Sequence, residues 1–216
     1  MKIKWLGIAC FLITSNRGLK IITDPYEIVN PDHIKHAPVK EYADIVTVSH
    51  EHGDHNHTAD LQGNPEIIRG VGKHTAKGID FLGIGSYHDN VFGAKRGPNT
   101  IICFSIDGIR ICHCGDLGHL PDDKTLKAIG RVDVLLCPTG GLPTIDLDEA
   151  MTLWDKMKPG VVIPMHFRGP KLLFPKCGVE DLLKRKPNAI QTGKSELELT
   201  AGKVPAGQIL ILEPAL

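Results

Sequence analysis

The sequence has no excess of charge of either sign, because its 216 residues contain 25 Lys and Arg and 25 Asp and Glu. It therefore lacks the basic footprint of a nucleic-acid-binding protein or of one that binds an anionic membrane surface. No run of about 18 apolar residues occurs, so we expect no membrane-spanning helix. The apolar segment Trp5–Ile13 imitates a short secretion signal, but Gly7 interrupts it and no Ala-x-Ala site follows.

The sequence also lacks the composition of a disulfide-stabilised domain. A chain of this length is long enough for one sizeable core and needs no disulfides, so we expect a single α/β domain over residues 1–216. Reduced thiols fit a cytoplasmic protein. Cys112 and Cys114 flank a histidine and suggest a soft-metal site, although core packing is the favoured interpretation because no second pair exists. The cysteines lie mostly inside apolar segments: Cys10, Cys103, Cys112, Cys114, Cys137 and Cys177.

The most informative segment is the one that begins with the apolar, β-branched residues 45–48. It continues into four histidines and one aspartate, namely His50, His52, Asp54, His55 and His57. Gly53 allows a tight bend within this group. Imidazole and carboxylate are ligands that Zn, Fe and Mn accept, and the spacing lets two metals share one loop. The alternative is a solvated His-rich loop.

Two further apolar segments, Ile109–Asp116 and Val161–His166, also end in ligand-type residues. We expect three strands to direct these residues to one edge of a rigid sheet. Asp107-Gly108 predicts a hairpin between residues 100–106 and 109–112. Other strands are predicted over residues 2–14, 19–23, 66–69, 132–137 and 208–212. Helices are predicted over residues 58–63, 121–129 and 179–184. A further helix is predicted to begin at Asp146, where Asp146-x-x-Glu149 has the pattern of a capping box. Residues 26–43 and 90–99 are predicted loops, the latter over the site.

The order His50-x-His52-x-Asp54-His55 resembles the signature of the metallo-β-lactamase superfamily. Asp24, His88, Gly115-Asp116 and His166 follow the order of that family. The resemblance implies an αββα four-layer sandwich. The Trp5-Leu6-Gly7 start and the Ser-Tyr-His-Asp, Cys-Gly-Asp-Leu-Gly and Pro-Met-His-Phe blocks look most like small metal-dependent hydrolases related to the ascorbate-phosphate lactonase group.

The resemblance also implies how the candidate ligands divide. His50, His52 and His88 would bind a first metal, and Asp54, His55 and His166 a second, with Asp116 bridging them. His113 competes with His88 as the third ligand. Asp24 either orients a ligand histidine or caps its turn, and the turn role is the favoured one. Five other histidines are expected at the surface: His33, His36, His57, His74 and His119, the last near the rim.

This ligand set predicts a hydrolase that uses a metal-bridging hydroxide on a small ester, lactone or phosphodiester, with Asp54 and Asp116 as catalytic residues. The cofactors would be two divalent ions, Zn first, with Mn or Fe as alternatives. The expected partner is a small-molecule substrate, and a phosphodiester substrate would be anionic. A homo-oligomer is compatible with the sequence. Arg168, Tyr87 and Asn99 are the candidate substrate residues, with Arg168 as a clamp for a phosphate or carboxylate.

Three alternative functions remain open. The first is an iron-dependent oxidoreductase of the sulfur-dioxygenase type on the same fold. A di-iron oxygen reductase is disfavoured, because that group has a pattern with Glu at the position where this chain has His52. A phosphodiesterase or nuclease acting on RNA is the second, and the neutral charge argues against it. A metal-binding protein without catalysis is the third. One departure bears on the substrate, because this chain has Ile8 where the most similar group usually has His.

Overall fold

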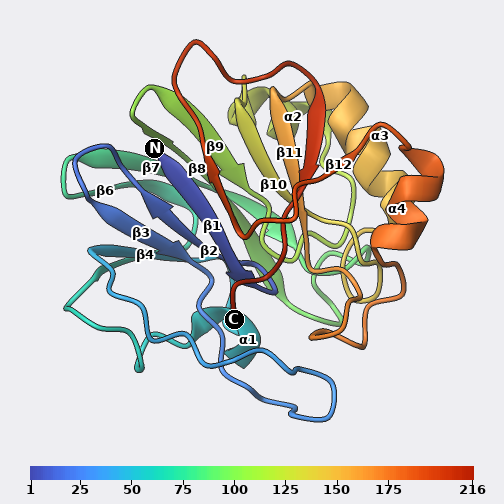
Figure 1. The fold of residues 1–216 in the computed structure, drawn as a ribbon, viewed down its shortest axis with the longest axis horizontal. Helices are drawn as coiled ribbons and strands as arrows, with labels where there is room; N and C mark the ends of the chain where they lie inside the picture. Colours follow the sequence, from blue (N-terminus) through green and yellow to red (C-terminus); the bar gives the residue numbers. More distant parts are fainter.

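The first of two facing β-sheets is built mainly from the N-terminal third of the chain. The computed structural model describes residues 1–216 (Figure 1). This sheet has the order β13-β1-β2-β3-β4-β5. Its strands are β1 (Lys2–Gly7), β2 (Cys10–Thr14), β3 (Lys20–Thr23), β4 (Ile45–Val48), β5 (Glu66–Arg69) and β13 (Glu196–Glu198). β4 runs parallel to β3 and β5, and its four residues are all buried, which gives the His-rich segment after it a rigid base.

The second sheet has eight strands in the order β12-β14-β11-β10-β9-β8-β7-β6. β7 and β9 are each antiparallel to β8, and β9, β10 and β11 are parallel, so β7, β9 and β11 all end at one edge. Its strands are β6 (Gly72–Ala76), β7 (Ile79–Tyr87), β8 (Pro98–Ile106), β9 (Ile109–His113), β10 (Val134–Pro138), β11 (Val161–Met165), β12 (Ile190–Gln191) and β14 (Gln208–Ile211).

The helices are few and short. α3 (Leu147–Met157) and α4 (Val179–Arg185) lie outside β10 and β11, and α2 (Asp123–Ile129) connects β9 to β10, while α1 (Gly53–Asn56) follows β4 (Figure 1). The predicted capping box of α3 is present: Glu149 N–H donates to Asp146 and Asp146 N–H donates to Glu149. None of the helices is long and apolar enough to cross a membrane.

The core lies between the two sheets, where buried apolar side chains of both form one cluster. The αββα sandwich inferred from the sequence is confirmed by these facing sheets, with α1 as the one helix that follows a strand of the first sheet. The second sheet also contains three buried cysteines, Cys103, Cys112 and Cys137, and a fourth, Cys114, directly follows β9; all four are free. This confirms that Cys112 and Cys114 pack in the core.

Local patterns identified most elements correctly. The hairpin of β8 and β9, helices α2, α3 and α4, and strands β5 and β14 are present where they were predicted. The helix predicted over 58–63 is wrong, because that segment is irregular and forms only a bridge between Gln62 and Tyr42. β6, β12 and β13 were missed since they are short and lack an apolar alternation. The predicted loop 90–99 ends earlier, at Pro98, where β8 begins.

Candidate metal centre

The His-rich segment leaves β4 and turns into α1, whose four residues include Asp54 and His55. Two groups of ligand-type atoms form around it, and within each group the atoms lie within 4.8 Å of one another. One group is His50, His52 and His88, and the other is Asp54, His55 and His166. His88 follows β7 and His166 follows β11, so both arrive from the edge where these strands end. This is the division that the family pattern implied.

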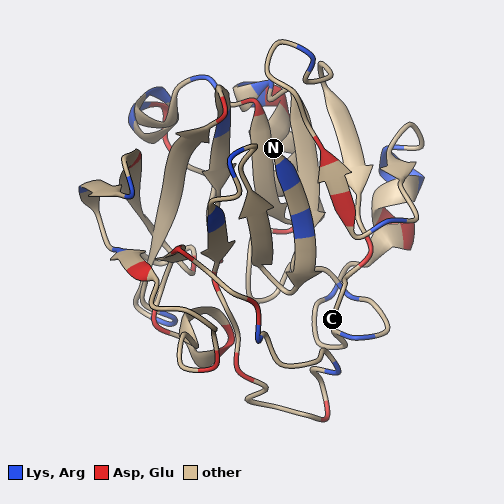
Figure 2. Ribbon diagram, turned by 60° about the vertical axis from the view of Figure 1, so that its left-hand side comes forward, with Lys and Arg blue, Asp and Glu red and all other residues tan.

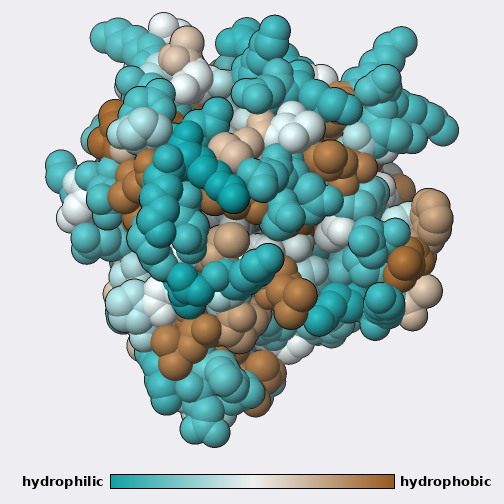
Figure 3. All heavy atoms as spheres, turned by 90° about the vertical axis from the view of Figure 1, so that its right-hand side faces the viewer, coloured by the Kyte–Doolittle hydropathy of each residue, from teal (hydrophilic) through white to brown (hydrophobic).

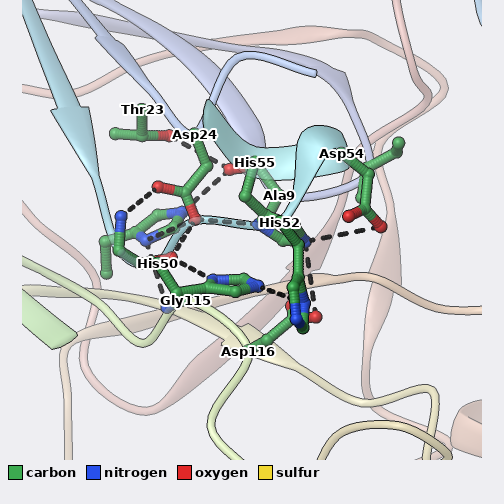
Figure 4. Close-up of polar contacts among 12 residues, drawn as sticks. Ala9, Thr23, Asp24, His50, His52, Asp54, His55, Gly115 and Asp116 are labelled. Atoms are coloured by element: carbon green, nitrogen blue, oxygen red, sulfur yellow. Dashed lines mark hydrogen bonds and ion pairs between the residues drawn. The ribbon is translucent and has the colours of Figure 1, made fainter. Parts of the chain in front are cut away.

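Asp116 lies between the two groups. Its Oδ2 is 3.2 Å from Nε2 of His88 in the first group. In the second group it is 3.3 Å from Nε2 of His55 and 3.5 Å from Nε2 of His166. Figure 4 shows Asp116 and Asp54 on two sides of the histidine cluster. Asp116 is therefore the side chain that connects both groups.

Several buried polar atoms in this cluster have no hydrogen-bond partner. They are Nε2 of His55, Nδ1 of His88, both ring nitrogens of His166 and Oδ1 of Asp116. A buried polar atom without a partner costs about 1–3 kcal/mol, so five in one place require an explanation. Imidazole nitrogens and carboxylate oxygens that converge in this way fit a divalent cation.

The electrostatics of the cluster point the same way. Burial lowers the pKa of His50 to about 3, and burial lowers the pKa of His166 as well, so both rings are neutral at pH 7. Burial alone would raise the pKa of Asp116, but His166 and His55 hold the pKa well below its usual range. Burial likewise opposes charge on His55, yet Asp116, Asp24 and Asp54 raise its pKa. The buried carboxylates, Asp116 above all, are thus stabilised by positive charge, and a bound cation would supply it.

Asp24 lies behind this cluster and is completely buried. Its carboxylate accepts hydrogen bonds from the N–H and Oγ of Ser49 at 2.8 and 2.5 Å and pairs with Nδ1 of His55 at 2.9 Å. Asp24 also groups with His50 and His55 as a third set of ligand-type atoms. Its oxygens are already occupied, so we assign it to orienting His55, and the favoured turn-cap interpretation is wrong.

His113 has a structural role outside the cluster. It is buried, its Nε2 lies 2.8 Å from the carbonyl of Ala9, and Gly115 N–H donates to its Nδ1 at 3.1 Å. Both ring nitrogens are used, which favours His88 as the third member of the first group. Ile8, at the position where the resemblance implied a His, has a φ of 51° and its carbonyl accepts from His166 N–H. The backbone at Ile8 thus positions His166 without a side-chain ligand.

Asn99 is not a loop residue that contacts substrate, because it lies buried in β8. Its amide nitrogen donates to Ser86 and to the carbonyl of Cys114, and its Oδ1 accepts from Asp116 N–H at 3.0 Å. A side chain at Gly115, where φ is 55°, would clash with Asn99 and Ser49. Asn99 therefore positions the loop that carries Asp116.

The other two substrate candidates differ from each other. Arg168 is directed to the start of α4, where its guanidinium pairs with Glu180 at 2.5 Å and Asp181 at 3.4 Å. The interpretation of Arg168 as an anion clamp is therefore corrected, because its guanidinium is paired with these two carboxylates. Tyr87 is exposed at the end of β7, next to His88, and its role stays a prediction. Among the remaining histidines, His36 was wrongly expected at the surface, because it is buried beside Gly7 and contacts Leu216.

Sequence reasoning missed the role of Asp89, which directly follows His88. Its carboxylate accepts from four backbone N–H groups, those of Val91, Gly93, Lys95 and Arg96. Burial raises the pKa of Asp89, but these four bonds outweigh burial and hold the pKa at about 2. The signal available in the sequence was an aspartate two residues before a turn.

Asp89→Asn is expected to destabilise the protein at neutral pH. The folded pKa lies below the ordinary value, so the charged form contributes stability above about pH 4 that is lost as the pH falls through about 2. Urea midpoints of wild type and variant should therefore differ at pH 7 and converge between pH 4 and pH 2. A difference that stays constant over this range would contradict the assigned role.

Comparison with known proteins gives one consistent result. The model of the beta-lactamase superfamily domain matches residues 2–166. A UPF0173 metal-dependent hydrolase of Carboxydothermus hydrogenoformans is 32% identical over 193 residues, 77% of this chain and 84% of that protein. A UPF0173 protein of Pyrococcus furiosus is 30% identical over 203 residues, 86% of this chain and 92% of that one.

Solved structures agree with the fold. A candidate Zn-dependent hydrolase of the metallo-β-lactamase superfamily from Thermotoga maritima has a TM-score of 0.80 and 33% identity, and the match covers 98% of each chain. Igni18, a metallo hydrolase from Ignicoccus hospitalis, has a TM-score of 0.65 at 19% identity, with 99% and 95% covered, and supports the fold alone. The chain therefore belongs to the metallo-β-lactamase superfamily and, within it, to the UPF0173 metal-dependent hydrolases. The ascorbate-phosphate lactonase-like group stays a narrower prediction.

Proposed function

We propose that this protein is a binuclear metal-dependent hydrolase of a small ester, lactone or phosphodiester. The observation that carries the proposal is the position of Asp116 between two groups of ligand-type atoms. His50, His52 and His88 would hold one ion, Asp54, His55 and His166 the other, and Asp116 both. Nitrogen and oxygen donors favour Zn, with Mn and Fe as alternatives.

The side chains have distinct tasks in this reaction. Two ions bound there would supply a water of lowered pKa and polarise the oxygen under attack. Asp54 is the half-buried carboxylate of the set, with an Oδ2 3.9 Å from Nε2 of His55, and it can take up the proton of the attacking water. Asp24 and Ser49 hold the imidazoles from behind. Lysines and arginines are interspersed with acidic residues in Figure 2, which supports a small-molecule substrate over nucleic acid.

The direct test is metal analysis of the purified protein followed by assays with chromogenic esters, lactones and phosphodiesters. Two equivalents of metal and turnover of at least one of these substrate classes are expected. One equivalent of iron with oxygen uptake would contradict hydrolysis and support the oxidoreductase alternative.

Asp54→Ala is expected to lower turnover by about 10²–10⁴-fold, the range for loss of a general acid–base group. Wild-type turnover should rise with pH through an apparent pKa near 7, which is the value for metal-activated water. The variant should lose this rise. Asp60→Ala, a nearby exposed carboxylate, serves as the control. Equal pH profiles in Asp54→Ala and wild type would remove Asp54 from the mechanism.

Asp24→Asn is expected to weaken metal binding by about 10–100-fold, because it loses the charge that orients His55 without changing its size. The measurement is competition with a chelator, and Asp44→Asn is a matched control, since Asp44 also accepts a backbone N–H, that of Lys20, at the start of a strand. Unchanged affinity in Asp24→Asn would contradict its positioning role.

A further inference from the structure

Exposed apolar side chains gather on the loops around the metal centre. Ten large hydrophobic residues of the chain are exposed, and six of them lie on loops or a strand end close in the chain to the candidate ligands or to residues that contact them; we call the six the apolar rim. They are Val29, Tyr87, Val91, Phe92, Leu142 and Leu173. Phe92 is 84% exposed and Leu142 71%. Single exposed apolar residues are ordinary, but a majority placed around one site is informative.

One half of the apolar rim contacts α1, which carries Asp54 and His55, and the end of β7, which leads to His88. The Val29 side chain lies against Gly53, the first residue of α1, since a Cβ built there would be 2.8 Å from its Cγ1. The ring of Phe92 packs edge-on against that of Tyr87 with centroids 6.0 Å apart. Tyr87 immediately precedes His88. Val29 and Phe92 therefore both pack against segments that carry candidate ligands.

The other half surrounds His166. Gly140 packs so closely on the carbonyl of His166 that a side chain there would clash, and Leu142 extends from the same loop. The ring of Phe174, next to Leu173, packs edge-on against the His166 ring with centroids 5.5 Å apart. Leu142 is two residues from Gly140 and Leu173 directly precedes Phe174, so both belong to segments that contact His166.

The backbone under the two most exposed rim residues is unfavourable for them. Phe92 has a φ of 58° and Leu142 a φ of 42°, the left-handed region where a large side chain is rare and glycine is favoured. The four bonds to Asp89 hold the loop that carries Phe92 in this conformation. Neither side chain belongs to the buried core, so burial in the fold does not explain why a large apolar residue stands at these two positions.

The size of the apolar rim fits a small ligand better than a protein, because it has six side chains, whereas a stable protein interface takes about 20–30 residues of each partner. Figure 3 shows one face of the molecule, on which apolar side chains form separate patches with hydrophilic residues between them. Next to His166, the guanidinium of Arg168 is paired with Glu180, so it is not free for a phosphate. The apolar character of the rim and the pairing of Arg168 favour a hydrocarbon group over a phosphoryl group.

We propose that the apolar rim binds a hydrocarbon group of the substrate, and that the substrate is a carboxylic ester or lactone whose acyl part carries several carbons. The proposal rests on the proposed hydrolytic function and narrows its substrate class. The carboxyl end would lie at the metal cluster and the chain would extend over Phe92 and Leu142.

The test is calorimetric binding of acetate and octanoate, two products of such a reaction, to the zinc-loaded protein. Full burial of one methylene is worth about 4-fold in affinity, and half coverage about 2-fold. Octanoate should therefore bind about 60-fold more tightly than acetate. The double variant Phe92→Ala, Leu142→Ala should lose about 10-fold for octanoate and leave acetate unchanged. Val71→Ala, equally exposed on the turn before β6, is the control and should leave both affinities unchanged.

Equal affinities for the two acids, or an octanoate affinity unaffected by the double variant, would overturn the proposal. A wild-type dimer that the double variant converts to a monomer in light scattering would also overturn it, since a second copy would then occupy the apolar rim. Binding requires no turnover, so this outcome is separate from that of the hydrolase assay. Octanoate binding without hydrolysis would refute the proposed function, and with it the ester or lactone substrate, but would support the apolar rim as a surface that binds a hydrocarbon group.

Discussion

Asp116→Asn is expected to lower turnover by about 10³-fold and to reduce the bound metal from two equivalents to one. The substitution preserves size and removes the charge that faces His88 on one side and His55 and His166 on the other. Loss of metal-supplied charge stabilisation is worth several kcal/mol, which corresponds to this factor. The measurements are steady-state kinetics and elemental analysis of the same preparation.

The control for this variant is Asp123→Asn, an exposed carboxylate on α2, which should keep both metal and activity. Retention of two metals with normal turnover in Asp116→Asn would show that this aspartate does not connect the two groups.

Zinc is expected to raise the midpoint of thermal unfolding by about 8–16 °C over the chelated protein. A ligand present at 1,000 times its Kd stabilises the folded state by about 4 kcal/mol. Each kcal/mol shifts the midpoint by about 2–4 °C in a domain of this size. The physical source is the pairing of buried nitrogens and oxygens that otherwise lack partners.

Scanning calorimetry with zinc and with a chelator checks this shift, and His74→Gln, a histidine outside the cluster, should show the same shift as wild type. A midpoint that zinc leaves unchanged would mean that the folded cluster does not bind the ion.

The parts of the site that the sequence predicted were those fixed by strand ends. An apolar strand that ends in a ligand-type residue places that residue at the edge of the sheet, whatever the loops do. His50, His88, Asp116 and His166 converge for this reason. The His-x-His-x-Asp-His spacing placed the rest, because β4 and α1 are adjacent in the chain.

The errors concern residues whose partners are distant in sequence. Arg168 pairs with acids of α4, and no local pattern shows that α4 approaches it. His36 is buried because Gly7 leaves room for its ring. Asn99 was placed in a loop, since the start of β8 at Pro98 carries no apolar alternation. Tertiary packing decides each of these cases, and propensity cannot anticipate it.

The central claim is that His50, His52, His88, Asp54, His55, His166 and Asp116 hold two cations. Anomalous X-ray scattering at the zinc edge from crystals grown with zinc tests it most directly. We predict two peaks, one beside His50, His52 and His88 and one beside Asp54, His55 and His166, with Asp116 between them. A single peak, or no peak among these side chains, would contradict the claim.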